Sequence, residues 1–276
     1  MRLGGPLFGE VRSPEEWVTL VRRWGYRAAY APVSPEASSE EIAAYREAAE
    51  RADIVIAEVG VWNNPLSRHP GERKAALDAC VRALSLADEL GARCCVNIGG
   101  SLGEKWDGPC ADDLGEEAFD LIVETVRSII DEVKPLRTFY TLETMPWMYP
   151  HTAESYERLI KAVDRKAFAV HFDPVNMIWS PERFFHNAEV IRDFVRRLGP
   201  WIRSCHLKDV RLQDRFLVHL EEVIPGKGNL DYRTLLSELD RLDDVPGMLE
   251  HLSTSEEYVQ ARDYVTKVAR EIGVGL

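Results

Sequence analysis

The sequence predicts a closed (β/α)8 barrel that occupies residues 1–276 as one domain. Short β-rich runs alternate with amphipathic helical stretches from end to end, which is typical of a parallel α/β fold. Eight such units favour a closed barrel of about 250 residues over an open doubly wound sheet, which is the alternative fold. No Gly-x-Gly-x-x-Gly motif follows the first expected strand, so a dinucleotide site has no support.

Eight short apolar runs supply the expected strands. In chain order they are residues 3–8, 28–33, 54–61, 93–98, 138–143, 168–173, 202–207 and 247–251. Turn residues and helical patterns separate them, so each run is expected to be followed by one helix, eight in all.

Capping residues mark several of the expected helices. Ser13 is expected to cap a helix that starts at Pro14, because serine accepts hydrogen bonds from the first helical amides and proline fits the first position. A second cap is expected at Ser39, just before two glutamates. Gly91 is expected to end the third helix, since glycine adopts the left-handed conformation found after many helices.

Composition limits the classes of partner. The net charge of −12 opposes binding to nucleic acid, whose affinity depends on clustered lysine and arginine. No apolar run is long enough for a membrane span, and the first residues lack the apolar core of a signal peptide. The five cysteines form no Cys-x-x-Cys pair and are expected to be reduced thiols. We therefore expect a cytoplasmic protein without nucleic acid or membrane partners.

Ionisable side chains stand at the ends of four consecutive expected strands. In a (β/α)8 barrel the active site lies at the carboxyl ends of the strands. Glu143, Asp173, His206 and Glu250 occupy these positions in strands five to eight. Three converging carboxylates are costly without a cation, although each residue alone would suit an ordinary salt bridge. Oxygen ligands with one nitrogen suit Mn²⁺ or Mg²⁺, and Co²⁺ or Zn²⁺ are alternatives.

Three further ionisable residues are expected near this set. His171 shares a strand face with Asp173 one layer deeper, so we expect it to support the site through hydrogen bonds rather than to bind the metal. Lys208 is expected at the mouth, where it would either neutralise an oxyanion or pair with Asp209 or a site carboxylate. Glu58 is expected to bind a substrate hydroxyl or to form a structural ion pair.

Aromatic and glycine residues fall in the loops above the expected site. Trp62, Trp106, Trp147 and Trp179 follow strands three to six. Their flat faces are expected to stack on the apolar face of a sugar, while packing under a loop is the alternative for each. Two glycine clusters, in residues 97–101 and 225–228, allow the backbone to approach a ligand closely, with only weak support for a phosphate.

Taken together, these segments resemble the xylose isomerase-like TIM-barrel superfamily. That superfamily includes ketose 3-epimerases, inosose dehydratase, hydroxypyruvate isomerase and endonuclease IV. The resemblance covers nearly the whole chain, and its most specific segments are residues 142–143, 171–176, 206–209, 225–232 and 249–251.

The resemblance implies a metal ion and a pair of acid/base residues. It implies that Glu143, Asp173, His206 and Glu250 bind one divalent metal. It also implies that Glu143 and Glu250 face each other across the substrate and exchange a proton at one carbon. The intermediate would be an enediolate.

Two positions depart from the epimerase pattern. Asn176 stands where these enzymes usually carry a histidine; it is expected to hydrogen-bond a substrate hydroxyl but cannot titrate. Their arginine near the strand-seven histidine has only Arg211 and Arg215 as candidates here. Endonuclease IV is discounted, because strands three and four end in Trp62 and Gly99 rather than in metal-binding histidines.

The predicted function is isomerisation or epimerisation of a small sugar or sugar derivative. A lyase that uses the same enolate is the alternative, either a keto-polyol dehydratase or a 3-keto-sugar deglycosidase. A non-catalytic sugar-binding barrel is a third hypothesis, which the four converging ligands oppose. The expected partner is a small sugar or keto-polyol, and dimers and tetramers are common in the superfamily, so a homo-oligomer stays open.

Overall fold

Eight parallel strands close into a barrel in the computed structural model, which describes residues 1–276. Each strand pairs with its neighbours in chain order, and the last barrel strand pairs with the first. The strands are β1 Arg2–Gly4, β2 Ala28–Tyr30, β3 Val55–Gly60, β4 Cys94–Asn97, β5 Tyr140–Glu143, β6 Phe168–Phe172, β7 Ile202–Leu207 and β10 Pro246–Leu249. The predicted single-domain (β/α)8 barrel is confirmed.

Every predicted run overlaps one barrel strand, and most strands are shorter than the run. The difference is largest at the start of the chain, where β1 ends at Gly4 although the apolar run continues to Phe8. Pro6 lies in this run and has no N–H with which to continue the ladder. The apolar residues after Gly4 therefore belong to a loop.

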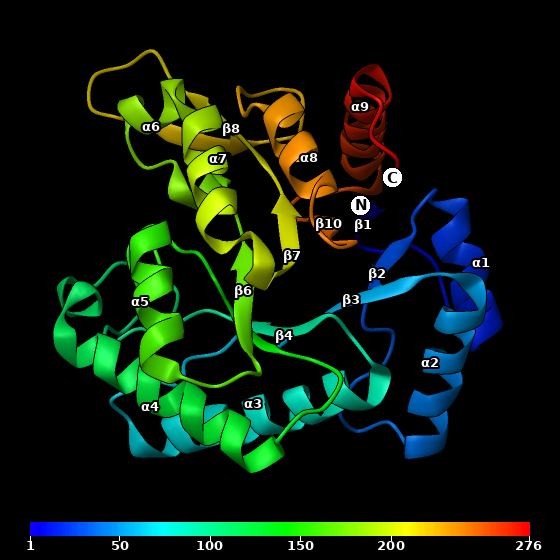
Figure 1. Ribbon diagram of the computed structural model, residues 1–276, viewed down its shortest axis with the longest axis horizontal. Coiled ribbons are helices and arrows are strands. Elements are labelled where there is room, and N and C mark those ends of the chain that lie inside the picture. The colour runs from blue at the N-terminus through cyan, green and yellow to red at the C-terminus, as the bar shows by residue number, and fades with distance from the viewer.

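Nine helices lie outside the strands, as Figure 1 shows. They are α1 Pro14–Arg23, α2 Ser39–Ala52, α3 Pro70–Leu90, α4 Glu116–Val133, α5 Ala153–Val163, α6 Pro181–Phe185, α7 Asn187–Leu198, α8 Tyr232–Asp240 and α9 Ser255–Ile272. The predicted caps at Ser13 and Gly91 are confirmed. The predicted cap at Ser39 is wrong by one residue, because the side chain of Ser38 accepts the hydrogen bond from Glu41 N.

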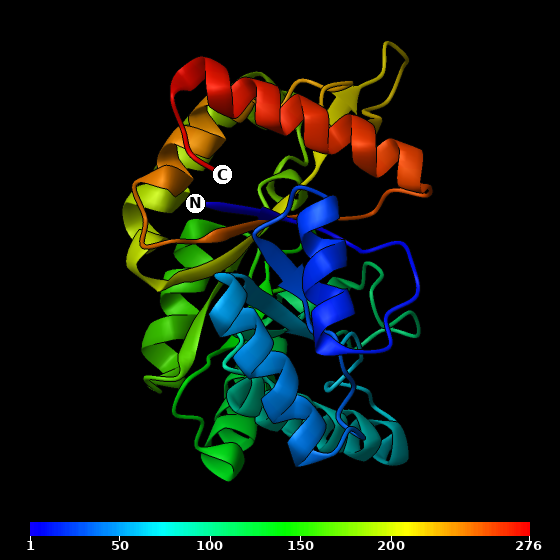
Figure 2. The ribbon, with the colours of Figure 1, turned by 90° about the vertical axis from the view of Figure 1, so that its right-hand side faces the viewer.

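Two features interrupt the simple alternation of strand and helix. Both α6 and α7 follow β6, so the prediction of eight helices is wrong by one. A hairpin of β8 Asp209–Leu212 and β9 Leu220–Val223 follows β7 and was not predicted. Figures 1 and 2 show the hairpin projecting beyond the barrel strands. Since β8 begins two residues after β7 ends, the hairpin stands at the carboxyl end of the barrel.

Close packing between strands and helices fixes the strands that carry the site. Phe172 of β6 stacks on Phe194 of α7 with ring centroids 4.2 Å apart and an interplanar angle of 9°. The Tyr156 hydroxyl of α5 donates to Leu142 O at 2.6 Å and accepts from His171 N at 3.3 Å. This one side chain therefore ties together the ends of β5 and β6.

The two ends of the chain meet beside the barrel. The amino group of Met1 donates to Gly275 O at 3.4 Å, and both ribbon views place the termini side by side (Figures 1 and 2). Among the nine helices, none combines the length and the apolar character that crossing a membrane requires.

Candidate metal centre

Four strand ends bring three carboxylates and one imidazole together at the carboxyl end of the barrel. Glu143 is the last residue of β5, Asp173 directly follows β6, His206 lies near the end of β7 and Glu250 directly follows β10. One ligand atom from each lies within 4.8 Å of the others. The four side chains are almost completely withdrawn from solvent. The structure thus assembles the set that the strand ends suggested.

His206 stands at the centre of this set. Its Nδ1 lies 3.0 Å from Glu143 Oε1 and 2.9 Å from Glu250 Oε1, and Asp173 Oδ2 is 3.8 Å away. Its Nε2 points away from these carboxylates and lies 3.3 Å from Glu58 Oε2. Nδ1 is therefore the nitrogen that would face a bound cation, and Nε2 contacts the Glu58 carboxylate on the other side of the ring.

Glu58 forms a second, deeper layer inside the barrel with His171 and Ser204. Its Oε1 lies 3.0 Å from His171 Nε2 and accepts a hydrogen bond from Ser204 Oγ. The side chain is 1% exposed, and both of its oxygens are engaged. These contacts favour the structural ion pair over the substrate-binding alternative for Glu58. The His171 ring lies 4.1 Å from that of His206, and its supporting role stays a prediction.

Lys208 lies at the carboxyl end of the barrel, among the carboxylates. Its Nζ is 2.7 Å from Asp173 Oδ2 and 2.6 Å from Glu250 Oε1, and the side chain is 1% exposed. Of the two alternatives for Lys208, the structure shows the salt bridge to site carboxylates. Burial alone would lower the pKa of Lys208, but the carboxylates around it raise the pKa well above its usual range.

His206 and Lys208 also change the pKa values of the nearby carboxyl groups. Burial alone would raise the pKa of Glu250, but His206 and Lys208 lower it to about 2. Burial raises the pKa of Glu143, and the nearby Lys208 and His206 only partly oppose that effect. Burial would lower the pKa of His206, yet the surrounding glutamates raise it. Three carboxylates and two basic side chains thus share one buried cluster and offset one another's charge.

The donor set fits a hard divalent cation. Asp173 Oδ2 and Glu250 Oε1 are buried and lack a hydrogen bond of good geometry, although the Lys208 ammonium lies at ion-pair distance from both. Buried acceptors of this kind normally have partners. Carboxylate oxygens with one imidazole nitrogen suit Mn²⁺ or Mg²⁺. The set lacks the thiolates that are common in structural zinc sites. Glu143, Asp173, His206 and Glu250 would hold the ion.

Of two polar residues that follow barrel strands, Asn176 contacts the cluster and Asp209 holds the loop after the hairpin. Asn176 Nδ2 donates to Glu143 Oε1 at 3.1 Å, so the amide contacts a candidate ligand directly. The Asp209 carboxylate accepts backbone hydrogen bonds from Gly226 at 2.9 Å and Gly228 at 3.0 Å. The glycines of residues 225–228 therefore allow the backbone to come close to the Asp209 carboxylate. Arg211 pairs with Glu221 across the hairpin at 3.0 Å, away from the carboxylates.

No two of the four loop tryptophans pack against each other, and each has different neighbours. Trp62 is 44% exposed, and its ring lies 6.3 Å from that of His206. Trp147 Nε1 donates to Asp107 O, which joins the loops after β5 and β4. Arg183 stacks on Trp179 at 4.0 Å, and Trp106 is 37% exposed with no aromatic partner. Trp62 is therefore the best placed to contact a ligand.

Tyr30 is a site residue that sequence reasoning missed. Its hydroxyl donates to Leu249 O at 3.2 Å, next to Glu250. It lines a cavity of about 480 Å³ together with Glu58 and Trp62. The predicted run continued to residue 33, which placed Tyr30 inside it, whereas the strand in the structure ends at Tyr30 and so brings it to the mouth of the barrel.

The chain belongs to the xylose isomerase-like TIM barrel family, whose sequence model matches residues 18–268. No curated protein matches its sequence. Several solved structures share the fold. D-psicose 3-epimerase from Clostridium cellulolyticum H10, solved with D-tagatose, covers 100% of both chains with a TM-score of 0.72 at 14% identity.

Two further solved structures share the fold, one described as a different enzyme and the other containing magnesium. The probable 3-DHS dehydratase AsbF of Bacillus anthracis, involved in petrobactin synthesis, matches 93% of this chain and 94% of its own, with a TM-score of 0.68 at 14% identity. A xylose isomerase-like TIM barrel protein from Mycobacterium smegmatis, in complex with magnesium, matches 95% and 90%, with a TM-score of 0.66 at 17% identity. At these identities the likeness establishes the fold alone.

Proposed function

We propose that the protein is a divalent-metal-dependent isomerase or epimerase of a small sugar or sugar derivative. The observation that carries this proposal is the convergence of Glu143, Asp173, His206 and Glu250 within 4.8 Å of one another. Sugar epimerases occur among the proteins that share the fold, and one structural neighbour was solved with magnesium. Mn²⁺ or Mg²⁺ is the proposed ion.

The reaction requires a proton to leave and rejoin carbon. A divalent ion, when bound, supplies Lewis acidity that acidifies the carbon next to a carbonyl. Glu143 and Glu250 are the proposed acid/base pair. The carboxylate of each lies close to His206 Nδ1, and their strands, β5 and β10, lie on opposite sides of β7 in the sheet. One takes the proton and leaves an enediolate. The other returns a proton, to the opposite face in an epimerase or to the neighbouring carbon in an isomerase.

Neighbouring side chains would orient these carboxylates and the substrate. Asn176 donates to Glu143 Oε1, which leaves the other oxygen of Glu143 free to act on the substrate. Lys208 holds the carboxylates of Asp173 and Glu250. Trp62, beside His206, is the proposed stacking surface for the sugar, and Trp106 and Trp147 are proposed as outer contacts.

Solvent exchange tests the proposal most directly. Protein loaded with Mn²⁺ is incubated in D₂O with a panel of ketoses, and carbon-bound deuterium is measured by mass spectrometry. Deuterium should enter at least one ketose, and Glu143→Gln and Glu250→Gln should each abolish the exchange. The matched control is Glu189→Gln, whose side chain is 75% exposed on α7. Failure of exchange with every ketose in metal-loaded protein would contradict the proposal.

A lyase is the second candidate, and two observations favour it. A probable dehydratase shares the fold. Asn176 cannot exchange protons, and it contacts Glu143 at the position where the epimerases usually have a histidine. A lyase would use the same carbanion but expel a β-substituent, as a keto-polyol dehydratase or a 3-keto-sugar deglycosidase does. A new enone absorbance, or a released aglycone, would identify this reaction.

A further inference from the structure

A cavity lined by arginines lies at the end of the barrel opposite to the carboxylates. It has a volume of about 730 Å³ and is bordered by the first residues of β3 and β7 and by the residues just before β4 and β5. Ile202 and Arg203, which begin β7, line it, whereas His206 near the end of the same strand faces the carboxylates. The two sites are therefore separate.

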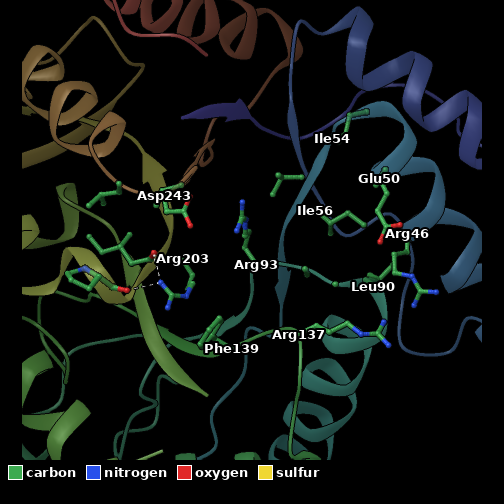
Figure 3. A pocket seen from close by; sticks show the side chains of 18 of the residues that line it. Arg46, Glu50, Ile54, Ile56, Leu90, Arg93, Arg137, Phe139, Arg203 and Asp243 are labelled. Carbon is green, nitrogen blue, oxygen red and sulfur yellow. Dashed lines mark hydrogen bonds between the residues drawn. The ribbon is translucent and has the colours of Figure 1, made fainter. Parts of the chain in front are cut away.

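The charge of this cavity has the opposite sign to that of the whole chain. Five arginines face two acidic residues in its lining, although the chain carries a net charge of −12. The lining arginines are Arg46, Arg93, Arg137, Arg203 and Arg241, and the acidic residues are Glu50 and Asp243. Figure 3 shows Arg93 between Arg203 and Asp243 on one side and Arg46 and Arg137 on the other.

The arginines of the cavity are only partly neutralised. Arg203 donates to the carbonyls of Pro200 at 3.0 Å and Ile202 at 3.1 Å, stacks on Phe139 at 4.1 Å and has no carboxylate at ion-pair distance. Burial lowers the pKa of Arg203, and the positive charge of Arg93 lowers it further. Arg93 reaches one carboxylate, that of Asp244 at 3.3 Å, which Arg2 already holds at 2.8 Å.

Several arginines around one partly enclosed cavity favour the binding of an anion, because a negative charge offsets the repulsion between their positive charges. A guanidinium presents parallel N–H groups that match the oxygens of a phosphate or carboxylate. Eleven of the 21 lining residues are hydrophobic, and Phe139 and Leu242 among them are half-buried, so part of the wall also suits an apolar body. We propose that this cavity binds a small organic anion, with an oxyanion group on Arg93 and Arg203 and an apolar portion against Phe139 and Leu242.

Calorimetry at low ionic strength with phenyl phosphate, benzoate and inorganic phosphate tests this proposal. Phenyl phosphate or benzoate should bind the full chain with one-to-one stoichiometry and more tightly than inorganic phosphate, because only the first two have an apolar body. The two aromatic probes separate a phosphate-selective site from a carboxylate-selective one. Arg93→Gln and Arg203→Gln should each weaken binding at least about tenfold, since each removes a charge-assisted contact.

Three controls make the outcome decisive. Arg233→Gln removes an exposed arginine that pairs with Glu271 on the outside of the barrel, and binding should be unchanged. Glu143→Gln alters the opposite end of the barrel, and it should also leave binding unchanged, which excludes binding at the carboxylates. Arg203→Lys keeps the charge and should retain part of the affinity, and thermal melting shows whether each variant is folded. Absence of binding at about 10 mM probe, or binding that survives both glutamine substitutions, would overturn the proposal.

Discussion

Replacing Glu58 with glutamine should weaken metal binding although Glu58 is not a proposed ligand. Glu58 Oε2 lies 3.3 Å from His206 Nε2, which keeps a proton on that nitrogen and leaves Nδ1 free to bind a cation. Glutamine retains the volume and one acceptor oxygen, which can still serve His171 and Ser204. Its amide nitrogen would then face His206 Nε2, so that two donors meet in a buried space.

The structure sets the size of the expected loss. An unpaired buried donor costs about 1–3 kcal/mol. His206 could avoid that cost by moving its proton to Nδ1, the nitrogen 2.9 Å from Glu250 Oε1, but a protonated Nδ1 cannot bind a metal. Loss of such a supporting carboxylate typically weakens metal binding about ten- to a hundredfold, which is roughly 1.4–2.7 kcal/mol.

The assay is a calorimetric titration with Mn²⁺ of wild-type protein and of Glu58→Gln, at one pH and one ionic strength. Glu72→Gln is the matched control, because Glu72 also accepts a hydrogen bond from a serine, Ser67 at 2.8 Å, but does not contact His206. The tautomer of His206 is read independently from its ¹⁵N chemical shifts in the metal-free protein, at a pH high enough to leave the ring neutral, because the surrounding glutamates raise the pKa of His206.

Equal Mn²⁺ affinity in folded Glu58→Gln and wild-type protein would refute this reasoning about His206. A wild-type protein that binds no Mn²⁺ would instead contradict the metal site itself, so the two failures can be told apart. A weaker variant whose His206 keeps its proton on Nε2 would show that Glu58 acts through packing rather than through the tautomer.

Three further variants probe the surroundings of the site. Lys208→Met should destabilise the protein by roughly 3–5 kcal/mol in the presence of a chelator, because it leaves buried carboxylates unpaired, and Mn²⁺ should restore most of the loss in urea unfolding. Phe172→Ala should cost about 3–5 kcal/mol in the same assay with or without metal, since it opens a cavity against Phe194. Gly228→Ala should cost about 1–3 kcal/mol and lower the melting temperature, because a Cβ there would collide with the Asp209 carboxylate.

The barrel could be predicted because its strands repeat one physical pattern. Each strand is buried on both faces, so it appears in the sequence as a short apolar run. The hairpin lacks that signal. Arg211 and Glu221 pair directly across its strands and are largely solvent-exposed, so charged residues occupy positions that a barrel strand would fill with apolar ones. A short, solvated antiparallel pair therefore resembles a loop when only the sequence is considered.

The candidate ligands could be predicted for a related reason. Strand ends meet at one mouth whatever the details of packing, so Glu143 and Asp173 needed only their places in the sequence to be brought together. The position of the Lys208 ammonium depends on four rotatable bonds of its side chain, and these follow the charges around it rather than the strand pattern. The sequence therefore left several roles open for Lys208, and the structure shows the one in which it pairs with Asp173 and Glu250.

The contact between Glu58 and His206 depends on how the barrel closes. Their strands, β3 and β7, are not neighbours in the sheet, so no pairing rule relates the two residues. They meet because both side chains point into the same narrow interior, at a depth that the stagger of all eight strands determines. The arginine cavity has the same origin: Arg93 and Arg203 stand far apart in the sequence, and only closure of the barrel makes their charges neighbours. The net charge of −12 thus gives no sign that side chains of opposite charge gather at the two ends of the barrel, carboxylates at one and arginines at the other.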